Sequence, residues 1–155
     1  MFLRTKTQKK PSGFTIIEIV VVIVIIAVMA AIAAPNLRKY MIQRRLNGAA
    51  RQVMSDLMLA RMQAVSKNND FKITFEGNSY TTLDDKDNDH VADAGEATVT
   101  KNIQTNYHDV SLSVTNTPIY FKPRGTASEG TTITLTNPAG SKTLTVSITG
   151  RVKKD

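Results

Sequence analysis

Residues 14–34 read FTIIEIVVVIVIIAVMAAIAA, and the only ionisable side chain among them is that of Glu18. As an α-helix this segment would be roughly 31 Å long, which matches the hydrocarbon core of a bilayer. A buried strand is excluded by the length, and a buried core helix would need more surrounding protein than the remaining chain supplies. The sequence therefore predicts a membrane-spanning helix over residues 14–34.

A secretory signal peptide is the alternative for this region, because a basic head before an apolar run is typical of such signals. Two features oppose it. The basic head ends in Pro11, Ser12 and Gly13, and the alanines at the end of the apolar run lead into a helical pattern that continues. Four basic residues precede the apolar run and four follow it closely, so the lysines and arginines do not determine the orientation.

The net charge of +7 is concentrated in the N-terminal third of the chain. Residues 1–13 carry +4 and residues 14–67 carry +5, whereas nine bases and eleven acids give residues 68–155 a charge of −2. A protein that binds nucleic acid over its folded surface usually keeps its basic residues on the globular part. The basic balance of the whole chain therefore does not favour nucleic-acid binding.

Glu18 needs an explanation, because ionisable groups inside a membrane are costly and are functional candidates by default. No Lys, Arg or His lies between residues 14 and 37. Cleavage after Gly13 would create an α-amino group on Phe14, one helical turn from Glu18, on the same chain or on a neighbour. Alternatively Glu18 lies in the headgroup layer, and its spacing leaves both interpretations open.

The run from Gly13 through Phe14 to Glu18, GFTIIE, followed by an apolar segment, resembles the prepilin leader of type IV pilins and type II secretion pseudopilins. The resemblance implies removal of residues 1–13 by prepilin peptidase and N-methylation of Phe14. It also implies that Glu18 aligns each incoming subunit with the N-terminal amine of its neighbour.

The same resemblance implies an orientation for the chain. The leader would be cytoplasmic, the chain would cross the cell inner membrane once, and the C-terminal domain would be extracytoplasmic before it enters a filament. Pro35 matches the proline near which the helix of such filaments loosens. A kink there is also expected because proline removes a helix hydrogen bond.

Beyond Pro35 the apolar residues recur at steps of three and four, as on one stripe of an amphipathic helix. The stripe consists of Ile42, Leu46, Ala49, Val53, Leu57, Ala60 and Ala64. It predicts one long helix over residues 14–67, whose outer half packs on the C-terminal domain. The arginines of this region, which lie mostly off the stripe, are expected to form a solvated face: Arg38, Arg44, Arg45, Arg51 and Arg61.

From Asp70 onward the hydrophobic period changes to two, and turn signals at residues 77–78 and 137–140 predict hairpins. Seven strands are expected, at residues 71–75, 79–83, 98–103, 110–115, 119–121, 132–136 and 143–149. The fold class is therefore α+β: a long N-terminal helix, transmembrane in its first half, followed by a small antiparallel, pilin-like β domain. The expected parts are a cleaved leader (1–13), the helix (14–67) and an extracytoplasmic β domain (68–155).

Three further segments, at residues 60–64, 121–128 and 146–152, resemble the GspH/FimT branch of pseudopilins and minor pilins. This resemblance implies a minor pseudopilin, a structural subunit of the type II secretion pseudopilus that acts in protein secretion. The alternative is a FimT-like minor pilin of a type IV pilus that binds DNA for uptake. The implied partners are other pseudopilins or pilins through the N-terminal helix, prepilin peptidase and the inner membrane, with DNA only in the alternative.

Residues 85–96, DKDNDHVADAGE, have the ligand spacing of a twelve-residue EF-hand loop, with carboxylates at positions 1, 3, 5, 9 and 12. Calcium is accordingly the one candidate cofactor, and none is required. The expected ligands are Asp85, Asp87, Asp89, the Val91 carbonyl, Asp93 and Glu96. Against calcium, His90 stands where the tight turn favours glycine, and strands rather than helices are expected on both sides. The alternative is a solvated acidic hairpin loop.

The C-terminal run GRVKK, residues 150–154, places three bases within four residues. It is similar to the basic tail that contacts DNA in some FimT-like minor pilins, which makes Arg151, Lys153 and Lys154 candidate DNA contacts. No aromatic residue interleaves with them and the β domain is net acidic, so the alternative is a solvated strand end.

Enzymatic chemistry has little support in the sequence. The chain has no Cys, which excludes a cysteine nucleophile, thiolate metal sites and disulfides. Neither His90 nor His108 lies beside a nucleophile in a recognised spacing, and no Gly-rich loop leads from a strand into a helix. We therefore expect a protein that is not an enzyme.

Overall fold

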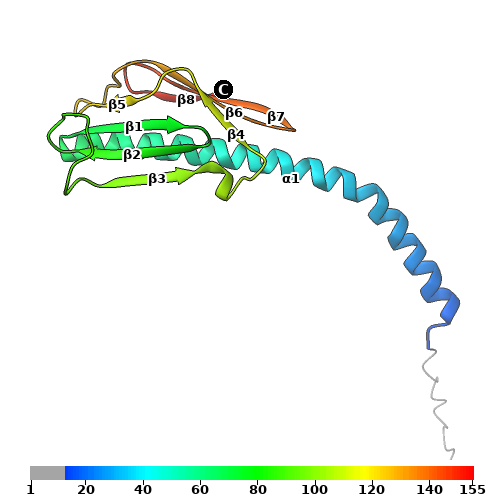
Figure 1. Cartoon of the computed structure of the whole chain (residues 1–155). Helices are drawn as coiled ribbons and strands as arrows, with labels where there is room; N and C mark the ends of the chain where they lie inside the picture. Colours follow the sequence, from blue (N-terminus) through cyan, green and yellow to red (C-terminus); the bar gives the residue numbers. More distant parts are fainter. Residues whose placement is uncertain (1–12) are drawn as a thin grey trace, which may run out of the picture. The chain divides into compact units, whose positions relative to one another are not determined.

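The computed structural model describes residues 13–155; residues 1–12, which hold most of the predicted leader, lie outside the described part. The chain divides into two units, the first ending at Arg38 and the second formed by Lys39–Asp155. The elements in chain order are α1 (Ile16–Lys67), β1 (Asp70–Glu76), β2 (Ser79–Asp85), β3 (Thr98–Asn102), the 3₁₀ helix η1 (Ile103–Thr105), β4 (Ser111–Val114), β5 (Ile119–Phe121), β6 (Thr131–Asn137), β7 (Gly140–Val146) and β8 (Val152–Lys154) (Figure 1).

Local signals determine both ends of the 52-residue helix α1. At its start the hydroxyl of Thr15 accepts a hydrogen bond from the Glu18 backbone N–H at 3.3 Å, which satisfies one of the free donors of the first turn. At its end Asn68 takes a left-handed conformation with φ 59°, as residues just beyond a helix commonly do. The helix thus begins two residues later than expected and ends at the expected Lys67.

In the first unit the apolar side chains of α1 are exposed. The helix contains an 18-residue window with a mean hydropathy of 3.2, and none of that window is buried. By length and composition it is apolar enough to cross a membrane. Pro35 lies inside α1, and the loosening of the helix near it stays a prediction.

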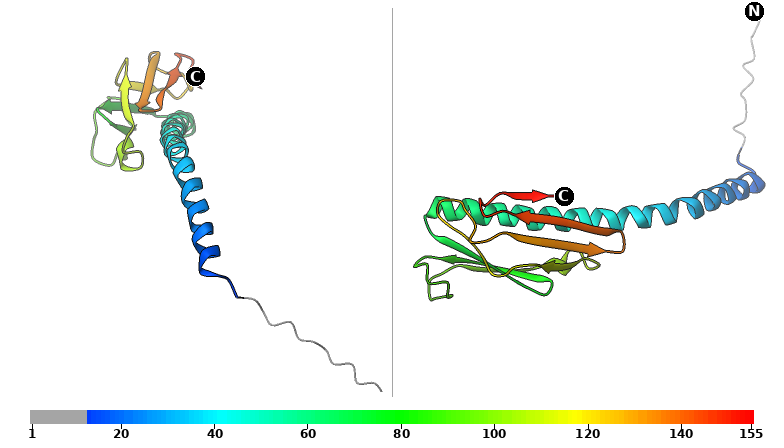
Figure 2. Two further views of the ribbon diagram at one scale, coloured as in Figure 1. Left: turned by 90° about the vertical axis from the view of Figure 1, so that its right-hand side faces the viewer. Right: turned by 90° about the horizontal axis from the view of Figure 1, so that it is seen from above.

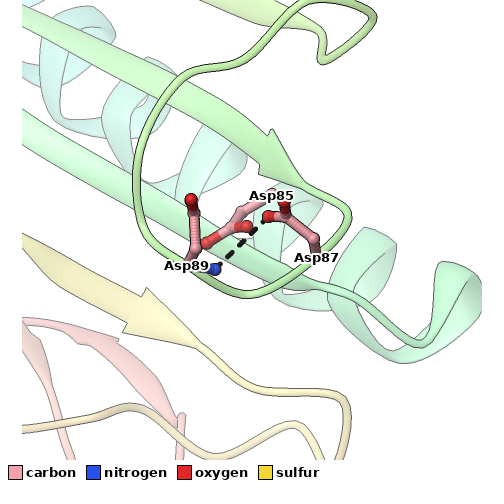
Figure 3. Close-up of side chains that lie close together, drawn as sticks. All are labelled: Asp85, Asp87 and Asp89. Carbon is pink, nitrogen blue, oxygen red and sulfur yellow. Dashed lines mark hydrogen bonds between the residues drawn. The ribbon is translucent and has the colours of Figure 1, made fainter.

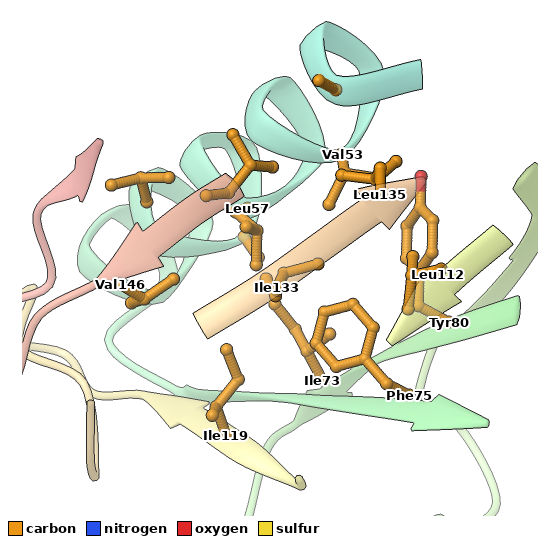
Figure 4. Packing of buried hydrophobic residues seen from close by; sticks show 14 of the residues in the cluster. Val53, Leu57, Ile73, Phe75, Tyr80, Leu112, Ile119, Ile133, Leu135 and Val146 are labelled. Atoms are coloured by element: carbon orange, nitrogen blue, oxygen red, sulfur yellow. The ribbon is translucent and has the colours of Figure 1, made fainter. Parts of the chain in front are cut away.

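In the second unit the predicted stripe of α1 is buried, apart from Ile42, which is half-buried. Ala50, which was not part of the predicted stripe, is also buried. Many of these residues are alanines, whose small side chains allow the helix to approach the sheets closely. The stripe packs into one apolar cluster with residues of both sheets, as Figure 4 shows around Val53, Leu57, Ile133 and Leu135.

The β domain consists of two four-stranded antiparallel sheets (Figure 2). The strand orders are β3-β2-β1-β5 and β4-β6-β7-β8. Burial alternates along the strands, so that Phe71, Ile73 and Phe75 of β1 face the core. The expected α+β fold class, a long helix followed by an antiparallel β domain, is confirmed.

The strand prediction is wrong in one place, near the C-terminus. The expected strand over residues 143–149 ends at Val146, and an eighth strand, β8, pairs back onto β7. A tight turn separates the two strands: the Ser147 carbonyl accepts from the Gly150 N–H at 2.8 Å, and the Ser147 N–H donates to the Arg151 carbonyl at 3.0 Å. The period-two pattern of Ser and Thr through this turn conceals it in the sequence.

The prediction that the arginines form a solvated face is wrong for two of them. Arg45 binds both carboxylate oxygens of Asp109, at 2.7 and 3.0 Å, and these bonds hold the pKa of Asp109 below its ordinary value. Arg61 donates to the Gly125 carbonyl at 2.8 Å. Arg38, Arg44 and Arg51 are exposed as expected. The sequence offers no signal for the two exceptions, because their partners lie 64 residues away.

Further polar contacts join α1 to the β domain. Asp56 accepts from the Tyr80 hydroxyl at 2.5 Å and from the Lys101 ammonium at 2.8 Å. Burial and the Asp56 carboxylate raise the pKa of Tyr80 well above its ordinary value. Asn137, in the β6–β7 hairpin, donates to the Ile42 carbonyl at 2.9 Å. These bonds fix the helix lengthwise against the sheets, which apolar packing alone does less specifically.

Among the glycines of the β domain, Gly150 leaves the least room for a side chain. Its φ is 76°, and a Cβ there would lie 2.0 Å from the Gly125 carbonyl oxygen and 2.9 Å from Nε of Arg61. Only glycine fits, because any side chain would displace the backbone that receives the Arg61 hydrogen bond.

We predict that Gly150→Ala lowers the free energy of unfolding by about 3 kcal/mol, since it adds a backbone clash to left-handed strain. Gly77→Ala is the matched control. Gly77 also has a positive φ, of 55°, but open space around it, so the cost there should be about 1 kcal/mol. Denaturant unfolding measures the loss of unfolding free energy in each variant. Equal losses would show that the close approach of Gly150 to the Gly125 carbonyl does not require glycine.

Candidate functional site

The predicted cleavage point lies where the chain enters α1. Gly13 and Phe14 precede the helix, and Phe14 is 80% exposed. A Cβ on Gly13 would meet nothing within 4 Å. The described chain therefore gives no packing reason for glycine at this position, and the exposed peptide bond is accessible in the way that a cleavage site requires.

Glu18 lies in the first turn of α1 and is exposed. Among residues 13–155, no basic side chain lies within ion-pair distance of it. One role of Glu18 was not predicted from the sequence. Its backbone N–H donates to the Thr15 hydroxyl, and the two residues have the spacing of a capping box. A carboxylate at this position also interacts favourably with the helix dipole. A capping role thus stands beside the predicted assembly role, which stays a prediction.

The acidic loop connects β2 to β3, so strands flank it as expected. Asp85, Asp87 and Asp89 each place one carboxylate oxygen within 4.8 Å of the others (Figure 3). Asp85 is fully buried, and its two oxygens accept from the backbone N–H groups of Asn88 and His90, at 2.7 and 2.9 Å. His90 has φ 67°, the conformation that favours glycine at this position of an EF-hand loop.

The other predicted ligands lie outside that group of three carboxylates. Glu96 accepts from the backbone N–H groups of Lys86 and Asp93, at 2.6 and 3.1 Å. The negative charge of Asp89, together with that of Asp87 and Glu96, raises the pKa of Asp93. The Val91 N–H donates to Asp89 at 2.7 Å. The carboxylates therefore order the loop's own backbone, and calcium binding stays a prediction.

The basic tail forms the edge strand β8 rather than a free end. Val152 is buried, whereas Arg151 and Lys153 are exposed. The Lys153 ammonium forms an ion pair with Asp155 at 2.6 Å, which reduces the positive charge available to a phosphate. DNA binding by Arg151, Lys153 and Lys154 stays a prediction.

These features define the class of the protein: a long helix, apolar and exposed in its first part, joined to two small antiparallel sheets is the pilin-like fold. The family model "Type II transport protein GspH" matches residues 49–150, and the model "Prokaryotic N-terminal methylation motif" matches residues 8–34. The chain belongs to the GspH family of pseudopilins and minor pilins. This is a family of structural proteins rather than of enzymes.

Solved structures of two pilin-like proteins share the fold. The type IV minor pilin FimU of Pseudomonas aeruginosa is 16% identical, with a TM-score of 0.58 over 73% of this chain and 90% of that one. The minor pseudopilin EpsH of the type II secretion system of Vibrio cholerae is 13% identical, with a TM-score of 0.54 over 72% of this chain and 96% of that one. No curated protein matches the sequence.

If the acidic loop binds calcium, calcium should raise the melting temperature of the full chain in detergent micelles by about 5 °C or more, because a ligand of the folded state stabilises it. Asp87→Ala should abolish the rise, and Glu129→Ala, which removes an exposed carboxylate outside the loop, should leave it intact. An unchanged melting temperature in calcium would support the solvated-loop interpretation.

Proposed function

We propose that this chain is a minor pseudopilin that acts in protein secretion as a structural subunit of a type II secretion pseudopilus. The observation that carries the proposal is the apolar window of α1, which its own chain leaves wholly unburied, together with a β domain of the GspH family. So large an apolar surface requires lipid or other subunits to cover it. A subunit that moves from a membrane into a filament meets both in turn.

In this proposal the leader faces the cytoplasm and the β domain lies outside the inner membrane. Prepilin peptidase cuts between Gly13 and Phe14, and Phe14 is then N-methylated. The new α-amino group is a positive charge at a helix N-terminus, where the dipole disfavours it. A carboxylate from Glu18 of a neighbouring subunit would neutralise that charge in a medium of low dielectric constant, where such pairing is strong.

A second candidate function is that of a minor pilin of a type IV pilus, which the likeness to FimU favours. In its DNA-uptake form this candidate needs the tail at Arg151, Lys153 and Lys154 to contact phosphates. The Lys153–Asp155 ion pair and the net negative charge of residues 68–155 count against that form.

We predict that mass spectrometry of the full chain expressed with its native membrane machinery shows loss of residues 1–13 and a methylated Phe14. An intact Met1, or a cut near Ala34, would contradict the leader assignment.

Glu18→Ala should leave membrane insertion intact and lower incorporation into filaments severalfold, because the amine loses its partner. Glu18→Gln separates the two roles of Glu18, since glutamine also fits a capping box but carries no charge. We expect both variants to be equally defective in a sheared-filament assay, with Glu76→Ala, an exposed glutamate of β1, as control. Normal incorporation of Glu18→Gln would assign the residue to the cap instead.

Deletion of the gene should abolish export of type II secretion substrates and leave DNA uptake unchanged. The combined variant Arg151→Ala with Lys153→Ala should restore export to the wild-type level, which an assay of secreted enzyme activity measures. The opposite result would favour the type IV pilin function. In that case the deletion strain exports normally but loses DNA uptake, and the Arg151→Ala, Lys153→Ala variant does not restore uptake.

A further inference from the structure

A groove of about 690 Å³ lies in the second unit between α1 and the turn that follows η1. Its helix wall includes Tyr40, Arg44 and Arg51, and Tyr107 of the turn forms part of the opposite wall. Gly48 shapes the groove, because a Cβ there would come within 2.7 Å of the Tyr107 ring. The absence of a side chain at residue 48 thus lets this ring lie directly against the helix.

The groove carries positive charge that the described part of the chain leaves unpaired. Arg44 and Arg51 are exposed, and neither forms an ion pair with any residue that the structure describes. Residues 35–55 contain five bases and no acid. The whole second unit, residues 39–155, has fifteen bases and twelve acids and thus a net charge of +3. The groove and the unit that holds it therefore both favour an anionic ligand.

The polar groups around Arg44 suit a phosphate. A guanidinium binds phosphate through two parallel hydrogen bonds. Asn47 contributes a side-chain amide to the lining, and Tyr40 and Tyr107 contribute hydroxyl groups that can donate to further phosphate oxygens. Met41, which is 50% exposed, and the two tyrosine rings add apolar surface beside these donors. A phosphate that is attached to an apolar body, as in a phospholipid, matches both kinds of surface.

Arg44 lies near the membrane along the chain. It follows Ala34, the last residue of the predicted span, by ten residues, which a helix covers in at most about 15 Å. Helical side chains tilt towards the N-terminus, and long basic side chains near the end of a span extend back to the lipid headgroups. The headgroup layer itself is about 5 to 8 Å thick. Arg51 lies a further seven residues, or about 10 Å of helix, along the chain, so Arg44 is the better placed of the two.

We propose that the end of this groove around Tyr40 and Arg44 binds the headgroup phosphate of an anionic phospholipid from the bilayer that anchors the subunit. A zwitterionic lipid fits less well, because its cationic amine would lie beside an unpaired arginine. Lipid surrounds the anchor before any other subunit arrives, so its headgroups meet the groove at an effective concentration that a soluble anion does not share.

The proposed contact needs only the predicted span over residues 14–34, so it holds for a pseudopilin and for a type IV pilin alike. Its consequence concerns departure from the membrane. The ion pair between Arg44 and the lipid breaks when the subunit leaves the bilayer, so the contact opposes extraction until the assembly machine acts on the subunit.

The test uses the full chain in lipid nanodiscs. The chain has no Trp, so Tyr40→Trp introduces a single fluorophore one helical turn from Arg44 and keeps an aromatic ring with a polar donor. The nanodiscs contain equal parts of phosphatidylglycerol and phosphatidylcholine, and one of the two lipids is brominated in its acyl chains. Bromine quenches only a nearby tryptophan, so the ratio of quenching by the two lipids measures the lipid preference of the groove. We expect phosphatidylglycerol to be preferred about fivefold.

Variants added to this reporter identify the residue responsible. Arg44→Gln should remove most of the preference, and Arg44→Lys should retain most of it. Arg51→Gln and Lys39→Gln are matched controls, since each also removes one positive charge. Arg51 is further from the predicted span, and Lys39 is nearer to it but does not line the groove, so both variants should keep most of the preference. An unchanged melting temperature in nanodiscs of phosphatidylcholine alone shows that each variant is folded.

Equal quenching by the two lipids overturns the inference and leaves the groove to an acidic protein or a nucleic acid. A preference that Arg44→Gln does not lower, or that Lys39→Gln lowers as much, overturns it as well, because diffuse charge near the bilayer then accounts for the result. Loss of the preference in excess inorganic phosphate would assign the groove to free anions instead. None of these outcomes bears on cleavage, methylation or export, so this contact can fail while the proposed function stands.

Discussion

Burial of one stripe of α1 against two β-sheets is the contact on which the second unit depends. Each sheet has an apolar inner face, and the helix residues from Leu46 to Ala64 lie in the same cluster as both. Full burial of a leucine or valine contributes about 1.5–3 kcal/mol, so Leu46, Val53 and Leu57 are its largest helical contributors. The alanines between them allow the helix backbone to lie close to the sheets, because a larger side chain would separate the helix from the sheets.

Directional bonds complement this packing. Apolar contacts alone would tolerate a shift of the helix by one turn, whereas the Arg45–Asp109 and Arg61–Gly125 bonds are made at one position only. Asp56 makes a third such contact between helix and sheet, because it accepts hydrogen bonds from Tyr80 and Lys101. Within the second unit the helix therefore has one defined register against the two sheets.

Periodicity predicted most of the fold. The stripe of α1, the hairpins at residues 77–78 and 137–140 and the α+β class follow from local patterns that water and backbone geometry impose. The partners of Arg45 and Arg61 did not follow, because they are 64 residues away in the sequence. The break at Ser147 did not follow because the alternating Ser and Thr residues continue through the turn. In the acidic loop the spacing of Asp85, Asp87 and Asp89 indicated that their carboxylates lie close together. The spacing did not indicate that backbone N–H groups of the loop donate to both oxygens of Asp85.

The sheet margins have a consequence for aggregation. The four edge strands are short: β5 and β8 span three residues each, β4 spans four and β3 spans five. Two of them carry lysines, Lys101 in β3 and Lys153 and Lys154 in β8. Short, charged edges offer few free backbone groups to a foreign strand, so they resist β-pairing between molecules. A β domain with such margins therefore resists amyloid-like association with its own copies at high local concentration.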